Sequence, residues 1–157
     1  MIPNEVQAFP VVAALLNSAP DALLGGKFDR GELTLEIGAE HILGVCAFLK
    51  HEQNFVRLST ITALDWYPEE PRFEVVYHLH SPERNERLRL KSRLAEANAE
   101  IDSVTTVWRG ANWYERETFD LFGVRFRNHP DLRRIMLPED WEGYPLRKDY
   151  PVTGNRV

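Results

Sequence analysis

The sequence predicts an α+β fold. A small mixed or antiparallel sheet of about four strands is covered by helices on one face and followed by a long, extended, proline-rich C-terminal arm. Apolar and polar residues alternate in four short segments, as in strands that bury one face. Two other segments carry apolar residues at helical spacing and can cover that sheet. The last part of the chain contains Pro130, Pro138, Pro145 and Pro151, which exclude any long regular element there.

The composition limits the classes of function. A chain of 157 residues with 43% hydrophobic and 27% charged residues fits one globular domain. Its net charge of -5 argues against non-specific binding to nucleic acid. The longest apolar runs are far shorter than the roughly 20 residues that a membrane-spanning helix needs, and the N-terminus lacks the features of a secretory signal. We therefore expect no nucleic-acid partner, and membrane association only through another protein.

Cys46 is the only cysteine of the chain. One thiol cannot form an internal disulfide, an iron–sulfur cluster site or a structural zinc site. Cys46 lies in the apolar run 42–49, so we interpret it as a small buried residue in a protein from a reducing compartment.

The body, residues 1–122, combines helices with strands. A short helix in residues 1–25 has Pro10 in its first turn and ends at Pro20 and the Gly25–Gly26 pair. The other expected elements of the body, in chain order, are a strand at 33–37, a helix at Ala39–His51, strands at Phe55–Leu64, Phe73–His80 and Arg87–Leu94, and a helix within Thr105–Leu121 that is interrupted near Gly110. Gly123 is a natural helix stop, because glycine tolerates the left-handed conformation.

One face of the last expected strand carries a row of cations, which are Arg87, Arg89, Lys91 and Arg93. They could bind phosphates or an acidic protein surface, but the preferred interpretation is a face that is solvated or paired with acids of a neighbouring strand, such as Glu74. His78 and His80 lie two apart on one strand face and could ligate a metal, although no third ligand is evident nearby in the sequence.

The arm, residues 123–157, is rich in charge and proline and also in large apolar groups, unlike a disordered tail. Its large apolar residues are Phe126, Leu132, Ile135, Met136, Leu137, Trp141, Tyr144, Leu146 and Tyr150. We expect one isolated helical turn at Pro138–Gly143. Because the arm is too broken to build a core and too apolar to remain in water, we expect it to pack on a different polypeptide.

Glu115, Glu117 and Asp120 are the best candidates for acid–base chemistry, since carboxylates three residues apart lie close together on a helix. Arg116 is expected to pair with Asp120 on the helix surface. The arginines that follow in the sequence, Arg125, Arg133 and Arg134, can also pair with these carboxylates, Asp120 included. A structural ion-pair network is therefore preferred, and a free-standing carboxylate enzyme is the remote alternative.

His129 precedes Pro130 and could carry a proton, but a hydrogen bond that fixes a turn is its preferred role. The chain contains neither a GxGxxG nor a GxxxxGK(S/T) phosphate loop. It also lacks a serine or cysteine nucleophile signature. These observations favour a binding or scaffolding subunit over an enzyme that acts alone.

Motifs at fixed spacing run from Trp108 to Pro151. They are Glu115-Arg116-Glu117, Asp120-Leu121-Phe122-Gly123, His129-Pro130-Asp131-Leu132-Arg133-Arg134-Ile135, Pro138-Glu139-Asp140, Glu142-Gly143 and Pro145-Leu146-Arg147-Lys148-Asp149-Tyr150-Pro151. This set closely resembles the signature of the C subunit of NADH-quinone oxidoreductase, the 30 kDa subunit family of respiratory complex I. The preceding strands are similar more loosely, and residues 1–30 contribute little.

The resemblance implies a cofactor-free subunit in the peripheral arm of a proton-translocating complex, on the cytoplasmic side of the cell inner membrane. There it would pack against the D subunit, which forms the quinone pocket with the B subunit, while other subunits use NADH, FMN and iron–sulfur clusters to reduce quinone. Related subunits serve membrane-bound hydrogenases and quinone reductases that use ferredoxin or coenzyme F420. This chain does not distinguish those alternatives, because the electron donor binds elsewhere.

The resemblance also implies a set of residues at the interface with the partner. They are Glu115, Arg116, Glu117, Asp120, Phe122, Gly123, His129, Pro130, Asp131, Arg133, Arg134, Pro138, Trp141, Pro145, Leu146, Arg147, Lys148, Asp149 and Tyr150. No catalytic, cofactor-binding or metal-binding residue is expected in the chain. Tyr144 stands where the family commonly has histidine, so no role of that imidazole carries over.

Overall fold

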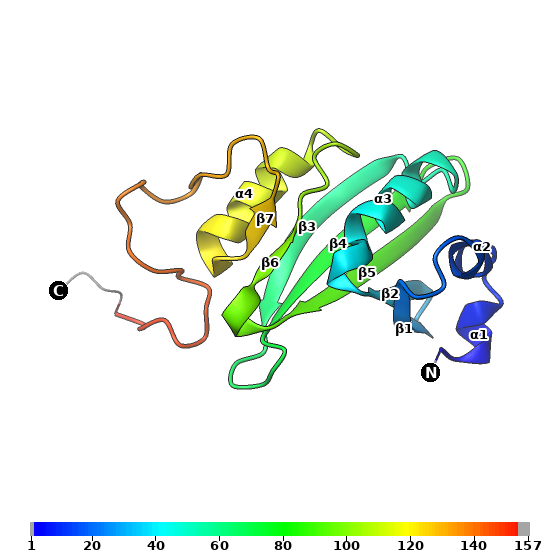
Figure 1. Cartoon of the computed structure of the whole chain (residues 1–157), viewed down its shortest axis with the longest axis horizontal. Coiled ribbons are helices and arrows are strands. Elements are labelled where there is room, and N and C mark those ends of the chain that lie inside the picture. Colours follow the sequence, from blue (N-terminus) through cyan, green and yellow to red (C-terminus); the bar gives the residue numbers. More distant parts are fainter. Residues whose placement is uncertain (1, 154–157) are drawn as a thin grey trace.

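The computed structural model describes residues 2–153 and confirms the α+β class. A five-stranded mixed sheet and a two-stranded sheet combine with four α-helices and two 3-10 turns in this part of the chain (Figure 1). The elements are α1 (Asn4–Gln7), α2 (Pro10–Ser18), β1 (Leu23–Asp29), β2 (Glu32–Ile37), η1 (Ala39–His41), α3 (Ile42–His51), β3 (Arg57–Asp65), β4 (Phe73–Ser81), β5 (Glu86–Leu94), η2 (Glu96–Asn98), β6 (Glu100–Asp102), α4 (Ala111–Phe122) and β7 (Arg125–Arg127).

The larger sheet has the strand order β1-β2-β5-β4-β3. Neighbouring strands are antiparallel except for β2 and β5, which are parallel. The chain leaves β2, crosses the sheet through α3 and enters the far edge at β3 (Figure 1). It then returns through β4 to β5 in the centre, and this crossover makes the sheet mixed.

The core lies between the sheet and the helices that cover one face. In β4 and β5 every second residue faces this core, as the alternation in the sequence predicted, and Tyr77, Leu79 and Leu90 are at most 1% exposed. Leu15 of α2 and Leu49 of α3 pack against the strands in the same cluster. Alternating burial therefore places the charged side chains of β5 on the opposite, outer face of the sheet.

The expectation that Gly25 and Gly26 end a helix was wrong, because both lie in the edge strand β1. A Cβ on Gly26 would lie 3.0 Å from the Thr34 carbonyl oxygen and 3.1 Å from the Leu35 side chain. The pair of glycines therefore permits close contact between β1 and β2. This edge strand is the fifth strand of a sheet for which the sequence predicted about four.

The last helix of the body, α4, begins at Ala111, directly after Gly110, and residues 105–110 form hydrogen-bonded turns instead of a helix. Gly123 ends α4 in the left-handed conformation with φ 77°, as expected. Short strands on both sides of α4, β6 and β7, then pair in parallel and bury Ile101 and Phe126. At Pro138–Gly143 a backbone bond from Trp141 N–H to the Pro138 carbonyl closes one isolated turn where a helical turn was expected.

Within residues 2–153, no helix combines the length and the apolar character needed to cross a membrane. Cys46 is buried in the core, as expected, and burial raises the pKa of its thiol. The same residues contain no cluster of three or more His, Cys, Asp or Glu that could hold a metal ion.

Candidate partner-binding arm

Asp120, in the last turn of α4, fastens the first part of the arm. Its fully buried carboxylate accepts backbone N–H bonds from Ile135, Met136 and Leu137 at 3.0, 2.7 and 3.0 Å. Arg134 Nη1 donates to the same carboxylate at 2.7 Å. Burial alone would raise the pKa of Asp120, but these hydrogen bonds hold it below its usual value. An ionised, buried carboxylate therefore organises residues 134–137 of the arm.

Arg116 does not pair with Asp120, so the expected surface pair was wrong. The guanidinium of Arg116 donates instead to the carbonyl oxygens of Arg133 and Arg134, both at 3.2 Å, and stacks on Trp113 at 5.3 Å. The arm packs on this face of α4 and excludes solvent from it, so the Arg116 side chain bonds to the arm backbone. The preferred interpretation of a structural network holds for Asp120, with Arg134 as its cation.

A second fastening point lies at the C-terminal end of α4. Helix ends leave carbonyls without partners inside the helix, and here Leu146 N–H donates to the Leu121 carbonyl at 3.0 Å and Arg147 Nε to the Phe122 carbonyl at 2.6 Å. The ring of Tyr144 contacts two guanidiniums, that of Arg134 at 5.1 Å and that of Arg147 at 4.6 Å from its centre. Both arginines that anchor the arm, Arg134 and Arg147, therefore make cation–π contacts with this one ring.

Replacing Tyr144 with alanine should loosen the arm by about 1–2 kcal/mol, because both cation–π contacts are lost. Tyr144→Phe retains the aromatic face and should have little effect. Trypsin cleavage after Arg134 and Arg147 measures the loosening. Equal cleavage rates in the alanine and phenylalanine variants would show that the ring does not hold the arginines.

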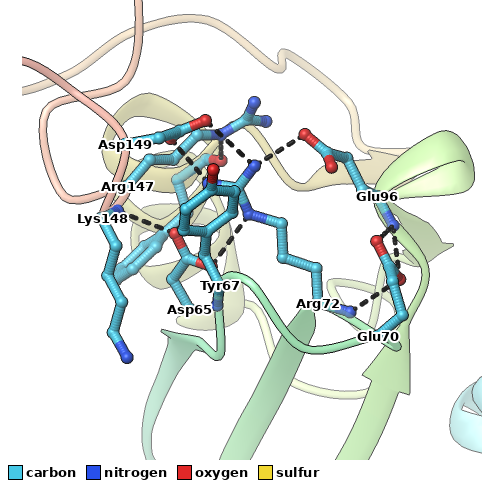
Figure 2. Close-up of polar contacts among 9 residues, drawn as sticks. Asp65, Tyr67, Glu70, Arg72, Glu96, Arg147, Lys148 and Asp149 are labelled. Atoms are coloured by element: carbon cyan, nitrogen blue, oxygen red, sulfur yellow. Dashed lines mark hydrogen bonds and ion pairs between the residues drawn. The ribbon is translucent and has the colours of Figure 1, made fainter.

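A third fastening point, absent from the residues that the sequence indicated, is centred on Arg72 (Figure 2). This side chain is 1% exposed, and Arg72 is the last residue of the β3–β4 loop, directly before β4. Its Nε and Nη2 both donate to the Asp65 carboxylate at 2.9 Å. Its terminal nitrogens also contact Asp149 of the arm at 2.7 and 3.2 Å and Glu96 at 2.6 Å. Arg72 therefore joins the loop, η2 and the end of the arm.

Asp65 is the buried counter-charge of this centre. Burial opposes its ionisation, but hydrogen bonds from Arg72 and from the backbone N–H groups of Lys148 and Tyr67 lower its pKa to about 2. The bond from Lys148 N–H, at 2.8 Å, holds the arm a second time at this point. The same pairing raises the pKa of Arg72, so both groups are charged at neutral pH.

Glu115 points into the body and not toward the arm surface. Its carboxylate accepts bonds from Ser103 Oγ and Val104 N–H, both at 2.7 Å, and lies 3.9 Å from His129 Nε2. His129 Nδ1 accepts a bond from Asp131 N–H at 2.9 Å, while Nε2 donates to the Asn112 carbonyl at 3.2 Å. His129 therefore fixes the turn at the start of the arm, as preferred from the sequence.

Burial raises the pKa of Glu115 from 4.5 to about 7, although its two hydrogen bonds act in the opposite direction. The folded state thus holds a proton that the unfolded state releases. This contribution to stability is complete below pH 4.5 and should be lost between pH 4.5 and 7, by roughly 3 kcal/mol. Urea unfolding of Glu115→Gln should lack this decline. A wild-type pH profile parallel to that of the variant would contradict the assignment.

The interface residues that the sequence indicated fall into three groups according to their burial within this chain. Those buried within this chain are Glu115, Arg116, Asp120, Phe122 and Gly123. Those half-buried are His129, Arg134, Trp141, Pro145, Arg147 and Tyr150. Those exposed are Glu117, Pro130, Asp131, Arg133, Pro138, Leu146, Lys148 and Asp149. The first group and most of the second attach the arm to its own body.

Large apolar side chains remain exposed along the arm and beside it. Met136 is 64% exposed, Leu146 51%, Ile135 38%, and Trp113 of α4 60%. The sequence indicated Leu146 as an interface residue and Ile135 and Met136 as apolar residues of the arm, but it did not single out Trp113. We refer to these four residues as the apolar patch.

Comparison with known proteins identifies the family. Residues 35–156 match the model of the family described as the respiratory-chain NADH dehydrogenase 30 kDa subunit. The chain is 46% identical over 143 residues to the NADH-quinone oxidoreductase C subunit of Geotalea uraniireducens, covering 91% of this chain and 87% of that protein. It is 49% identical over 126 residues to the C subunit of Geobacter sulfurreducens, covering 80% and 78%.

Two solved structures share the fold. A trypsin-resistant fragment (1-134) of Nqo5 superposes with a TM-score of 0.68 at 30% identity, covering 78% of this chain and 99% of that chain. The membrane-bound sulfane sulfur reductase, an archaeal respiratory membrane complex, contains a chain with a TM-score of 0.78 at 31% identity, covering 90% and 84%. The resemblance seen in the sequence is therefore confirmed, and this chain belongs to the 30 kDa subunit family of the multi-subunit NADH-quinone oxidoreductases.

Proposed function

We propose that this chain is a non-catalytic subunit of the peripheral arm of a proton-translocating NADH:quinone oxidoreductase. It braces the D subunit beside the quinone site, on the cytoplasmic side of the membrane, and the arm is its means of attachment. The observation that carries the proposal is that polar contacts fasten the arm to its own body while Met136, Leu146 and Trp113 remain exposed. A segment that served only to complete this fold would turn such side chains inward.

The anchors prepare the arm for a partner. Asp120, Arg72 and the end of α4 fix the backbone of the arm at three points. Binding then requires less ordering of the chain, which reduces the entropy lost on association. Protein interfaces have an apolar centre enriched in aromatic residues, Met and Arg. The apolar patch and Arg133, which is exposed, have this character.

We propose that the chain divides into a body, 1–122, and an arm, 123–157. The Nqo5 fragment, which is described as resistant to trypsin, is similar to 78% of this chain. A trypsin-resistant body is what the proposed division predicts for the present chain. Residues 154–157 of the arm lie outside the residues that the structure describes.

We assign the redox chemistry to other subunits. Cys46 is the only cysteine of the sequence and is buried, and a single thiolate cannot supply the ligands of an iron–sulfur cluster. FMN, the clusters, NADH and quinone are therefore proposed to bind to neighbouring subunits, with the D and B subunits closest to this chain. Two of the three carboxylates that were candidates for catalysis are engaged in structure, since Asp120 holds the arm and Glu115 faces the body, and the third, Glu117, is exposed on α4.

A complex with a different electron donor is the alternative. It is kept because the archaeal sulfane sulfur reductase, a respiratory membrane complex with another name, contains a chain of the same fold. The identities of 46% and 49% to C subunits of NADH-quinone oxidoreductases favour the first proposal. Identification of the co-purified subunits decides between them: flavin- and NADH-binding subunits support the first, and a nickel-ligating large subunit supports a hydrogenase.

Truncation after Asn128 tests the attachment. The truncated chain keeps Val124 and Phe126, which belong to the core, so it should fold, but it should no longer co-purify with the D subunit from detergent-solubilised membranes. The full-length double variant Met136→Ser/Leu146→Ser should also weaken co-purification. Leu24→Ser/Phe28→Ser, which alters exposed apolar residues of β1, is the matched control and should assemble normally. Full assembly of the truncated chain would refute the proposal.

A further inference from the structure

A patch of basic side chains crosses the outer face of the sheet, opposite the core. His80 of β4 lies directly between Arg57 of β3 and Arg87 of β5 in the strand register. In the next row His78 lies beside Arg89. Directly opposed residues of neighbouring strands project from the same face. These five residues therefore form one surface, here named the basic patch.

The basic patch lines a hollow of about 400 Å³, and Glu32 is the one acidic residue among the residues that line it. Arg89 pairs with Glu32, but Arg57 and Arg87 are exposed and have no acidic partner among residues 2–153. The other half of the same face is different, because Glu74 pairs with both Lys91 and Arg93. The preferred interpretation of the cation row, solvated or paired, therefore agrees with the structure: Arg89, Lys91 and Arg93 are paired, and Arg87 is exposed.

The surroundings of His78 and His80 also favour the binding of a negatively charged group in this hollow. Burial, and then the positive charge of Arg89, lower the pKa of His78. His80 Nε2 is buried and has no hydrogen-bond partner among the residues that the structure describes. A negatively charged group in the hollow would offset the charge of the arginines and supply an acceptor or donor partner for this nitrogen.

We propose that an acidic segment of a neighbouring subunit docks across the basic patch, with carboxylates on Arg57 and Arg87. Arginine binds carboxylates in a bidentate manner and suits interfaces better than lysine. The two arginines stand on strands separated by β4, thus about 10 Å apart at the backbone. Two carboxylates along a peptide fit this separation better than one small anion. The inference rests on the membership of a multi-subunit complex and is independent of where the arm docks.

Zero-length cross-linking in the assembled complex tests this inference. Arg57→Lys and Arg87→Lys retain the charge and introduce amines that a carbodiimide couples only to carboxylates in direct contact. Lys91, 2.7 Å from Glu74, provides the internal positive control on the same face. We expect cross-links from positions 57 and 87 to Asp or Glu residues of one other subunit. Cross-links confined to this chain, in a sample that contains the Lys91–Glu74 product, would overturn the inference.

Charge reversal provides the second measurement. Arg57→Glu/Arg87→Glu should reduce retention of the cross-linked subunit at least tenfold in 0.15 M salt, while the D subunit remains bound through the arm. Lys27→Glu/Arg109→Glu has the same change in net charge at exposed positions elsewhere and should retain both subunits. Equal retention in the two double variants would contradict docking at the basic patch. Because the D subunit is scored separately, failure here is distinguishable from failure of the arm to bind.

Discussion

Asp120→Ala is expected to release residues 134–137 of the arm from α4 while the body remains folded. The carboxylate is fully buried and accepts three backbone N–H bonds as well as the bond from Arg134. Removing one member of a buried ion pair costs about 3–5 kcal/mol, because the other member is left without compensation. Hydrogen exchange of the amides of Ile135, Met136 and Leu137 should therefore accelerate at least about 100-fold.

The matched control for this variant is Glu117→Ala on the same helix. Glu117 is exposed and has no ion-pair partner among residues 2–153, so its replacement should change stability by less than about 0.5 kcal/mol. Asp120→Asn, which keeps the shape but not the charge, should give an intermediate acceleration. Unchanged exchange at the three amides in Asp120→Ala would show that the carboxylate does not hold the arm.

Arg72→Met is expected to have the largest effect on the body, again about 3–5 kcal/mol. The variant leaves the Asp65 carboxylate, 2% exposed, without its bidentate partner and also detaches Asp149. The pKa of Asp65 should then rise from its present value of about 2. In the wild type, the lowered pKa gives stability that is present above pH 3.8 and lost as the pH falls toward 2. Urea unfolding at pH 7 and at acid pH measures both effects.

Two variants separate the roles of Arg72. Asp149→Asn removes only the exposed partner on the arm, 44% accessible, and should reduce stability by less than about 1 kcal/mol. Arg72→Lys keeps a charge but loses the planar fork that contacts two carboxylates at once, so it should remain well below wild-type stability. A lysine variant as stable as the wild type would mean that charge alone, and not the geometry of the fork, secures this centre.

The sheet was largely predictable because burial in strands follows a period of two. Tyr77, Leu79, Leu88 and Leu90 face the core as their alternation indicates. The edge strand β1 was missed, because the Gly25–Gly26 pair is usually a stop signal and its use here depends on close contact with β2. Strands β6 and β7 have three residues each, too few for any periodicity to emerge.

The anchors of the arm were predictable only in part. The motif identified Asp120 and Arg134 as important, but the direction in which α4 faces comes from the tertiary structure, so Arg116 was paired with the wrong group. Arg72 was missed because its arm partner Asp149 lies 77 residues away in the sequence. Local patterns cannot indicate such a pairing.

Site-specific photo-cross-linking from position 146 in the assembled complex tests the central claim most directly. The backbone N–H of Leu146 is bonded to the Leu121 carbonyl at the end of α4, which holds this residue in place. Its side chain is 51% exposed in this chain and can therefore contact a partner. Our account predicts a cross-link to the D subunit. Cross-links only to this chain, with Leu146 as accessible in the complex as in the isolated protein, would contradict it.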